Sequence, residues 1–172
     1  MSQWLRVRGV TLLQPFDADL NRAIMLLAPA HEVRSIAPQT FAAVRRSANE
    51  TDRIVVWSGE AQHSIYGDAT VNYAFRAWHD ACHLAADIPF TIAGEEAAVA
   101  AQCAALRARW SGCPQRWLDL IACDVLAVVY TLHATGEYLA DQRSAVQAIM
   151  ELPGGLQSIR PSREIHRYAY GA

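Results

Sequence analysis

Residues 120–132 read LIACDVLAVVYTL, a run that is apolar around the whole circumference of a helix apart from one carboxylate, Asp124. A helix without a polar face has to be covered on all sides, so this segment is expected to be the central helix of a helical domain. Charged and polar residues interrupt and flank the run, namely Asp124, Asp119, His133 and Glu137. We therefore interpret it as a buried core helix and not as a membrane span.

Helical patterns recur on both sides of this central segment. Apolar residues at spacings of three and four, capping residues, and breaks at proline and glycine mark the other helices. The expected helices cover residues 17–27, 38–47, 69–86, 95–110 and 141–150, with the central one beginning near Pro114.

The segment DRIVVWSGE, residues 52–60, has the density of β-branched residues that is typical of a short strand. The following HSIYGD, residues 63–68, is expected to pair with it and to form a small β-hairpin near residues 53–66. The sequence thus predicts a mainly α fold, a single-domain helical bundle over residues 1–152 that carries this hairpin. A Pro-Gly-Gly turn predicts that residues 153–172 form an extended C-terminal tail.

Composition limits the classes of function. The chain has 172 residues, of which 52% are hydrophobic and 19% charged, and its net charge is −2 at pH 7. That length is sufficient for one hydrophobic core without disulfides or structural metals. Without an excess or a run of basic residues, no binding of nucleic acid is expected. The N-terminal sequence MSQWLRVRGV lacks the apolar region of a signal peptide, so a cytoplasmic protein without a membrane segment is expected.

The candidate site begins on the helix expected over residues 69–86. Positions three or four apart share a helix face, so Arg76, His79 and His83 form one polar stripe. Two histidines at i and i+4 can present their imidazoles to one metal ion, as in the helical H-E-x-x-H motif. Such a pair also occurs by chance, so the metal interpretation depends on the residues around it.

Carboxylates and a further histidine strengthen the metal hypothesis. Glu95 and Glu96 begin the next expected helix, and antiparallel packing would return them to the His83 end of the stripe. His133 and Glu137 form a second i, i+4 pair, which joins the site if its helix faces the first. A ligand set of this kind suits zinc, iron or manganese. The alternatives are acids at a helix N-terminus for the glutamates and a solvated last turn for the second pair.

Residues 71–83, VNYAFRAWHDACH, and residues 89–96, PFTIAGEE, resemble a pattern found in poorly characterised phage and prophage proteins, including domains of large polyvalent phage proteins. That pattern reads F-R-A-x-H-D, a second His, then Phe and Gly-Glu-Glu. In the phage pattern a glycine precedes the second His, whereas Cys82 precedes His83 in this sequence. The resemblance implies a shared site and a phage or prophage origin, and it carries no established reaction.

The doublet His79-Asp80 also resembles that of the HD phosphohydrolase superfamily, whose helical enzymes hold a metal with an earlier His, the doublet and a later Asp. This second resemblance implies His63 as the earlier ligand and Asp124 as the later one. The alternative for Asp124, a carboxylate in an apolar helix, is a buried salt bridge. Asp124 and His133 lie on opposite sides of one helix, so a site can use only one of them.

Two functions from different classes follow from these residues. The first is a metal-dependent hydrolase in which the metal activates water, Asp80 or Glu96 acts as general base, and Arg76 steadies an anionic group. Its substrate would be small and anionic, phosphorylated or nucleotide-like. The second is a non-enzymatic interaction, inhibitor or accessory protein that binds a protein partner. In that case the His/Asp stripe is a structural hydrogen-bond network, and the C-terminal tail could join subunits of a homo-oligomer.

Overall fold

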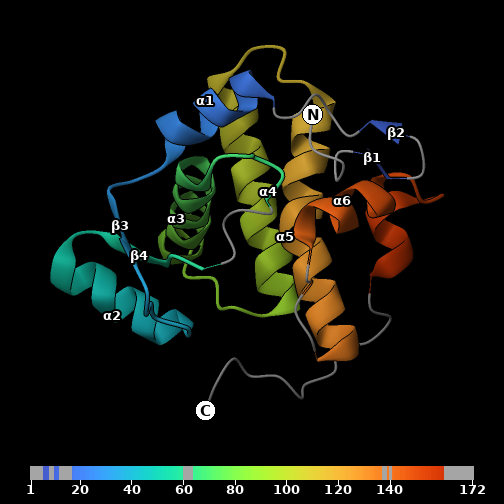
Figure 1. Ribbon diagram of the computed structural model, residues 1–172. Coiled ribbons are helices and arrows are strands. Elements are labelled where there is room, and N and C mark those ends of the chain that lie inside the picture. Colours follow the sequence, from blue (N-terminus) through green and yellow to red (C-terminus); the bar gives the residue numbers. More distant parts are fainter. Residues whose placement is uncertain are drawn as a thin grey trace.

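The computed structural model describes residues 17–59, 64–136, 139 and 141–160, and the backbone alone of residues 6–7 and 10–11. Within these residues the chain is mainly α-helical and forms a single domain, as expected (Figure 1). Consecutive helices pack against one another, α3 on α4, α4 on α5 and α5 on α6. The helices are α1 (Ala18–Leu27), α2 (Phe41–Thr51), α3 (Ala69–Ala85), α4 (Ile92–Arg109), α5 (Gln115–Thr135) and α6 (Gln142–Met150), followed by a 3-10 helix, η2 (Gly155–Ile159).

Five of the described helices begin at a residue whose side chain caps the first turn. A side-chain oxygen at this position satisfies backbone N–H groups that have no partner inside the helix. These caps explain why the helix starts lie within about three residues of the positions expected from the sequence. The capping residues are Asp17, Thr40, Asp68, Thr91 and Asp141 for α1, α2, α3, α4 and α6.

The central helix α5 is confirmed as the core element. It lies between α4 and α6, and Ile121 and Ala127 are fully buried in it. Among the described helices, α5 alone has the length and apolar composition of a membrane span, and more than half of that window is buried inside the protein. Gly136, in the left-handed conformation at φ 78°, ends the helix, a position that favours glycine.

The expected strand is present, but its predicted hairpin partner is wrong. β4 (Ile54–Trp57) pairs in parallel with β3 (His31–Arg34), and α2 forms the crossover between them. Residues 64–68 form turns instead of a strand. The sequence of β3, HEVR, contains one apolar β-branched residue and therefore gives little strand signal. A further two-residue pair joins β1 (Arg6–Val7) and β2 (Val10–Thr11).

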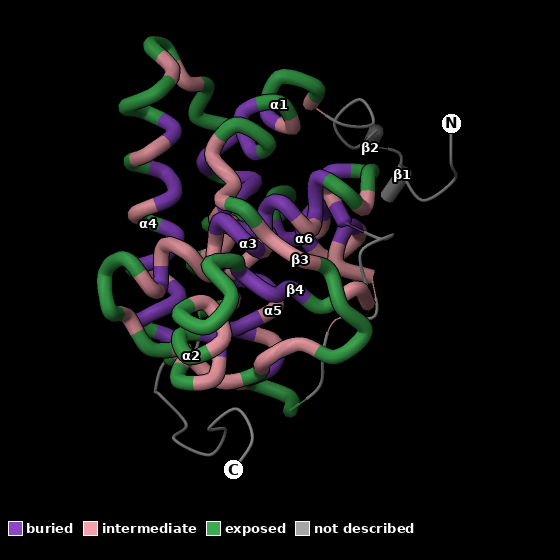
Figure 2. The backbone as a smooth tube through the Cα atoms, turned by 90° about the vertical axis from the view of Figure 1, so that its left-hand side faces the viewer, coloured by how far each residue is buried: buried purple, intermediate pink, exposed green. Residues whose placement is uncertain are grey.

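The small sheet attaches α2 to the side of α3. Ile54, Val55 and Val56 of β4 are buried, and Ile54 and Val56 pack with Ala77 of α3. Figure 2 shows β4 as a buried stretch next to α3, whereas α2 carries many exposed positions. The sheet therefore supports the face of α3 opposite the bundle.

The beginning of the segment expected as an extended tail belongs to the folded domain. Leu156 and Ile159 of η2 pack against the hydrophobic core, and η2 contacts both α5 and α6. Arg160 then pairs with Glu96 of α4. Residues 161–172, the rest of the expected tail, lie outside the described residues, so the proposed role of that tail in a homo-oligomer stays a prediction.

Candidate metal centre

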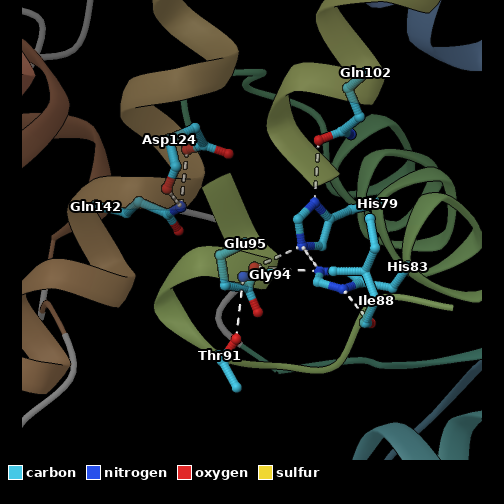
Figure 3. A network of polar contacts seen from close by, with 9 residues as sticks. All are labelled: His79, His83, Ile88, Thr91, Gly94, Glu95, Gln102, Asp124 and Gln142. Atoms are coloured by element: carbon cyan, nitrogen blue, oxygen red, sulfur yellow. Dashed lines mark hydrogen bonds and ion pairs between the residues drawn. The ribbon is translucent and has the colours of Figure 1, made fainter. Parts of the chain in front are cut away.

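Two neighbouring helices bring three potential metal ligands together. His79 and His83 come from α3, and Glu95 comes from the first turn of α4, where Thr91 caps the helix. Figure 3 shows the three side chains pointing toward one another across the α3–α4 interface. The antiparallel return of the chain through residues 86–91 therefore places a carboxylate at the histidine pair, as the sequence predicted.

The three ligand atoms form a compact triangle. His79 Nε2 lies 2.9 Å from Glu95 Oε2 and 3.0 Å from His83 Nε2, and the third edge, His83 Nε2 to Glu95 Oε2, is 3.4 Å. Ligands about 2.0–2.1 Å from a tetrahedral ion are separated by roughly 3.3 Å, so the triangle has close to the size of one face of a coordination shell. His79, His83 and Glu95 could therefore hold a metal ion.

The other nitrogen of each imidazole faces an oxygen atom. His83 Nδ1 donates to the carbonyl oxygen of Ile88 at 2.9 Å, and His79 Nδ1 lies 3.0 Å from Oε1 of Gln102. A ring whose Nδ1 carries the hydrogen presents the lone pair of Nε2, the form that binds a metal. Both Nε2 atoms are thus oriented into the triangle by contacts outside it.

The site is largely removed from water. The side chain of His83 is 0% exposed, that of Glu95 8%, and that of His79 14%. The ring of Phe90 packs edge-on against His83, with 4.7 Å between centroids, and Phe75 stacks on His79. The small exposed part of the cluster therefore lies on the His79 side.

In the metal-free protein, the pairing of His79 with Glu95 keeps a proton within the cluster. Burial lowers the pKa of His79, but the hydrogen bond and the charge of Glu95 outweigh it and raise that pKa to about 9. Burial acts to raise the pKa of Glu95, but the hydrogen bond and the charge of His79, with a contribution from the nearby His83, dominate and lower it to about 2. The metal-free cluster is therefore an imidazolium–carboxylate pair, and a metal ion would replace its proton.

Asp80 and Arg76 lie on the same helix as the two histidines. Asp80 is half-buried; burial raises the pKa of its carboxyl to about 6, although the charges of His79 and His83 act in the opposite direction. Arg76 Nη1 donates to the carbonyl oxygen of Trp57, the last residue of β4, at 2.9 Å and to that of Gly59, two residues further on, at 2.7 Å. Arg76 thus connects α3 to the small sheet.

Glu96 points away from the triangle, although it follows Glu95 directly. Its Oε1 accepts a hydrogen bond from the Tyr130 hydroxyl at 2.5 Å, and Arg160 donates to both of its carboxylate oxygens at 2.8 Å. Adjacent residues on a helix face directions about 100° apart, which is why Glu96 does not share the direction of Glu95. Through Tyr130 and Arg160, Glu96 instead holds α5 and the end of η2 against α4.

The structure does not bring His133 into the group of three. His133 lies in the last turn of α5, where its Nδ1 is buried without a hydrogen-bond partner among the described residues. Among the described residues, the side chains that cluster as possible metal ligands are His79, His83 and Glu95, and His133 is not one of them. Glu137, the other predicted ligand in this part of the chain, lies outside the described residues.

Asp124 also takes part in a different network (Figure 3). Its Oδ2 accepts from the Tyr66 hydroxyl at 3.1 Å, and its Oδ1 accepts from Gln142 Nε2 at 2.8 Å. Burial raises the pKa of the Asp124 carboxyl to about 7, against the lowering effect of these bonds and of nearby cations. Asp124 is therefore solvated by neutral donors and is not one of the three clustered ligands. His63, its expected companion in the phosphohydrolase pattern, lies outside the described residues.

Sequence reasoning missed two contacts that orient the histidines. Gln102 lies seven residues after Glu95, two turns along the same face of α4, and this spacing was a usable signal. The carbonyl of Ile88 belongs to the backbone, and no residue type reveals it.

Comparisons of the chain with protein-family models, with curated proteins and with solved structures give no match. The site therefore has to be interpreted from its own geometry, and the resemblances to phage proteins and to the HD superfamily stay predictions.

Proposed function

We propose that this protein binds one divalent transition-metal ion and uses it to activate water for the hydrolysis of a small anionic substrate. The observation that carries the proposal is the orientation of the two imidazoles. Their Nδ1 atoms face oxygen atoms outside the cluster, while their Nε2 atoms meet the carboxylate of Glu95. Two histidines and one carboxylate form the ligand set of several catalytic zinc and iron centres.

A catalytic role fits the number of ligands better than a purely structural one. Structural zinc sites are closed by four protein ligands, whereas catalytic sites use three and leave a position for water. The described cluster contains three, and its exposed part lies on the His79 side. Zinc, iron and manganese are the candidate ions, and the metal would supply a hydroxide nucleophile near neutral pH.

Asp80 and Glu96 are the two candidates for a general base that would accept a proton from that water. Asp80 follows His79 and is half-buried, so its carboxylate is our candidate for the general base. Glu96, the other candidate base, is held by Tyr130 and Arg160, and we therefore prefer Asp80. The choice of a phosphorylated or nucleotide-like substrate rests on the charges of the metal and Arg76, and a phage or prophage origin rests on the sequence resemblance alone.

The second candidate is the non-enzymatic interaction protein, and one observation favours it. The His79–Glu95 hydrogen bond satisfies both side chains without a metal, and each partner shifts the pKa of the other toward the charged form. A buried pair of this kind can have a purely structural role, which is to hold α3 and α4 in register. The same atoms thus bind either a proton or a metal, and metal analysis separates the two functions.

The His79→Ala variant is expected to lose metal that the wild type carries. We expect close to one equivalent of zinc, iron or manganese in wild-type protein purified without a metal-affinity column, measured by plasma mass spectrometry. The matched control is His133→Ala, which removes an imidazole outside the cluster and should retain the metal. Absence of metal from the wild type, even after reconstitution with all three ions, would favour the interaction protein.

The Asp80→Asn variant is expected to keep its metal and to lose activity. If Asp80 accepts a proton from the attacking water, kcat toward chromogenic phosphate mono- and diesters should fall by about 100-fold or more. Metal content, measured on the same samples, should stay unchanged because Asp80 is not one of the three clustered ligands. Equal kcat for Asp80→Asn and wild type would exclude Asp80 as the base.

A further inference from the structure

Gly94 lies where α4 touches the loop that leads into it. It sits in the first turn of α4, one residue before Glu95, and its N–H donates to the capping hydroxyl of Thr91 at 3.1 Å. A Cβ atom at this position would lie 1.9 Å from the carbonyl oxygen of Pro89 and 3.0 Å from Cγ2 of Ile88. The loop can therefore pack this closely on α4 only because residue 94 has no side chain.

The same loop holds one of the candidate ligands. The carbonyl of Ile88 accepts from His83 Nδ1, and the N–H of Ile88 donates to the carbonyl of His83, both at 2.9 Å. Two residues further on, the ring of Phe90 stands at 90° to the imidazole of His83. The position and the tautomer of His83 thus depend on where residues 88–90 lie.

We propose that Gly94 is a positioning residue of the metal centre, acting on His83 through the loop of residues 88–90. The close approach at Gly94 sets the loop, the Ile88 carbonyl then fixes the hydrogen on Nδ1, and Nε2 is left facing Glu95 (Figure 3). This inference rests on the proposed metal site. It assigns a function to the glycine of the Gly-Glu-Glu sequence that differs from those of the two glutamates.

A side chain at position 94 would displace a backbone carbonyl and could not be accommodated by rotating a flexible side chain. Because the Pro89 oxygen belongs to the main chain, the Ile88 carbonyl next to it would have to move as well. Loss of the acceptor for the second nitrogen of a metal-bound histidine commonly weakens metal affinity by about 10- to 100-fold. The three ligands themselves would remain in the protein.

The test is the zinc affinity of Gly94→Ala, measured by competition with a chromogenic chelator. We expect binding about 10- to 100-fold weaker than in the wild type. The matched control is Gly112→Ala: Gly112 has a φ of +76° and open space around it, so alanine there strains the backbone without meeting a neighbouring atom. That variant should lose stability and keep wild-type zinc affinity.

A second readout does not need the metal. In 15N NMR spectra of the metal-free imidazoles, wild-type His83 should carry its hydrogen on Nδ1, and Gly94→Ala should shift this ring toward the other tautomer or a mixture. If Gly94→Ala does not fold, Phe90→Leu tests the loop without the backbone clash and should also weaken zinc binding.

The outcomes separate this inference from the proposed function. Wild-type zinc affinity together with an unchanged His83 tautomer in Gly94→Ala would overturn the positioning role. A wild type that binds no metal would overturn the proposed function, and the tautomer of His83 would still decide whether Gly94 positions it.

Discussion

The Asp124→Asn variant is expected to be more stable than the wild type at pH 8. The pKa of Asp124 is raised from 3.8 to about 7 in the folded protein, with burial as the largest cause. A raised carboxyl pKa means that the folded state binds the proton more tightly than the unfolded state. The free energy of unfolding of the wild type should therefore fall as the pH rises from about 4 to 7.

The size of this effect follows from the pKa difference. Roughly three pKa units, at about 1.4 kcal/mol each, give about 4 kcal/mol as an order of magnitude. Asparagine has the shape of the protonated acid, keeps an oxygen for Gln142 Nε2, and can donate to the Tyr66 hydroxyl after that group rotates. Much of the pH dependence between 4 and 7 should therefore disappear in Asp124→Asn.

Urea unfolding of the metal-free proteins at pH 4, 6 and 8 measures both effects. The control is Asp119→Asn, which removes the same charge from an exposed position of α5 and should change stability by less than about 0.5 kcal/mol. If Asp124→Asn were less stable than the wild type at pH 8, the nearby charges of Arg76 and His79 would have to stabilise the Asp124 carboxylate by more than its burial destabilises it. Its hydrogen bonds to two neutral side chains would then be an incomplete account.

The helices were predictable because their signals are local. Asp17, Thr91 and Asp141 cap helices within a few residues of the expected starts, and α5 is buried because its sequence has no polar face. The partner of β4 was not predictable in the same way. β3 lies about twenty residues earlier, and its pairing depends on the path of α2 and not on any pattern within HEVR.

The candidate site, like the fold, was predictable where the signal is local and not where it depends on how the helices pack. The i, i+4 spacing of His79 and His83 and a short loop before Glu95 were sufficient to place the three together. The expected participation of His133 required α5 to face α3, and helix neighbours are decided by the packing of whole helices. The direction of Glu96 likewise depended on Tyr130, which only the packed structure brings near.

The Glu95→Gln variant should lose stability in the metal-free protein, with a definite pH window. The pKa of His79 is raised from 6.5 to about 9, so this contribution is complete below pH 6.5 and is lost as the pH rises through 9. The pKa of Glu95 is lowered from 4.5 to about 2, so the same interaction is complete above pH 4.5 and is lost as the pH falls through 2. The pair therefore stabilises most between pH 4.5 and 6.5.

Within that window Glu95→Gln should cost about 3 kcal/mol, the order of magnitude given by the shift at His79 alone, since both shifts describe one interaction. This window overlaps that of Asp124 only in part. Above pH 7, the free energy of unfolding of the wild type should still fall with pH as His79 loses its proton. If this fall is absent in Glu95→Gln and present in Asp124→Asn, the His79–Glu95 pair is its source.

The stabilisation of the protein by zinc should depend on Glu95 and not on its neighbour Glu96. At pH 7.5, zinc at about a thousand times its dissociation constant should stabilise the wild type by about 4 kcal/mol, and Glu95→Gln should abolish most of this gain. Glu96→Gln is the matched control, since it removes the same charge one residue away, at a carboxylate bonded to Tyr130 and Arg160. It should lose stability through those contacts and keep the full response to zinc. Equal responses of the two variants would mean that the ion binds elsewhere, because of these two carboxylates it is Glu95 that lies within reach of both imidazoles.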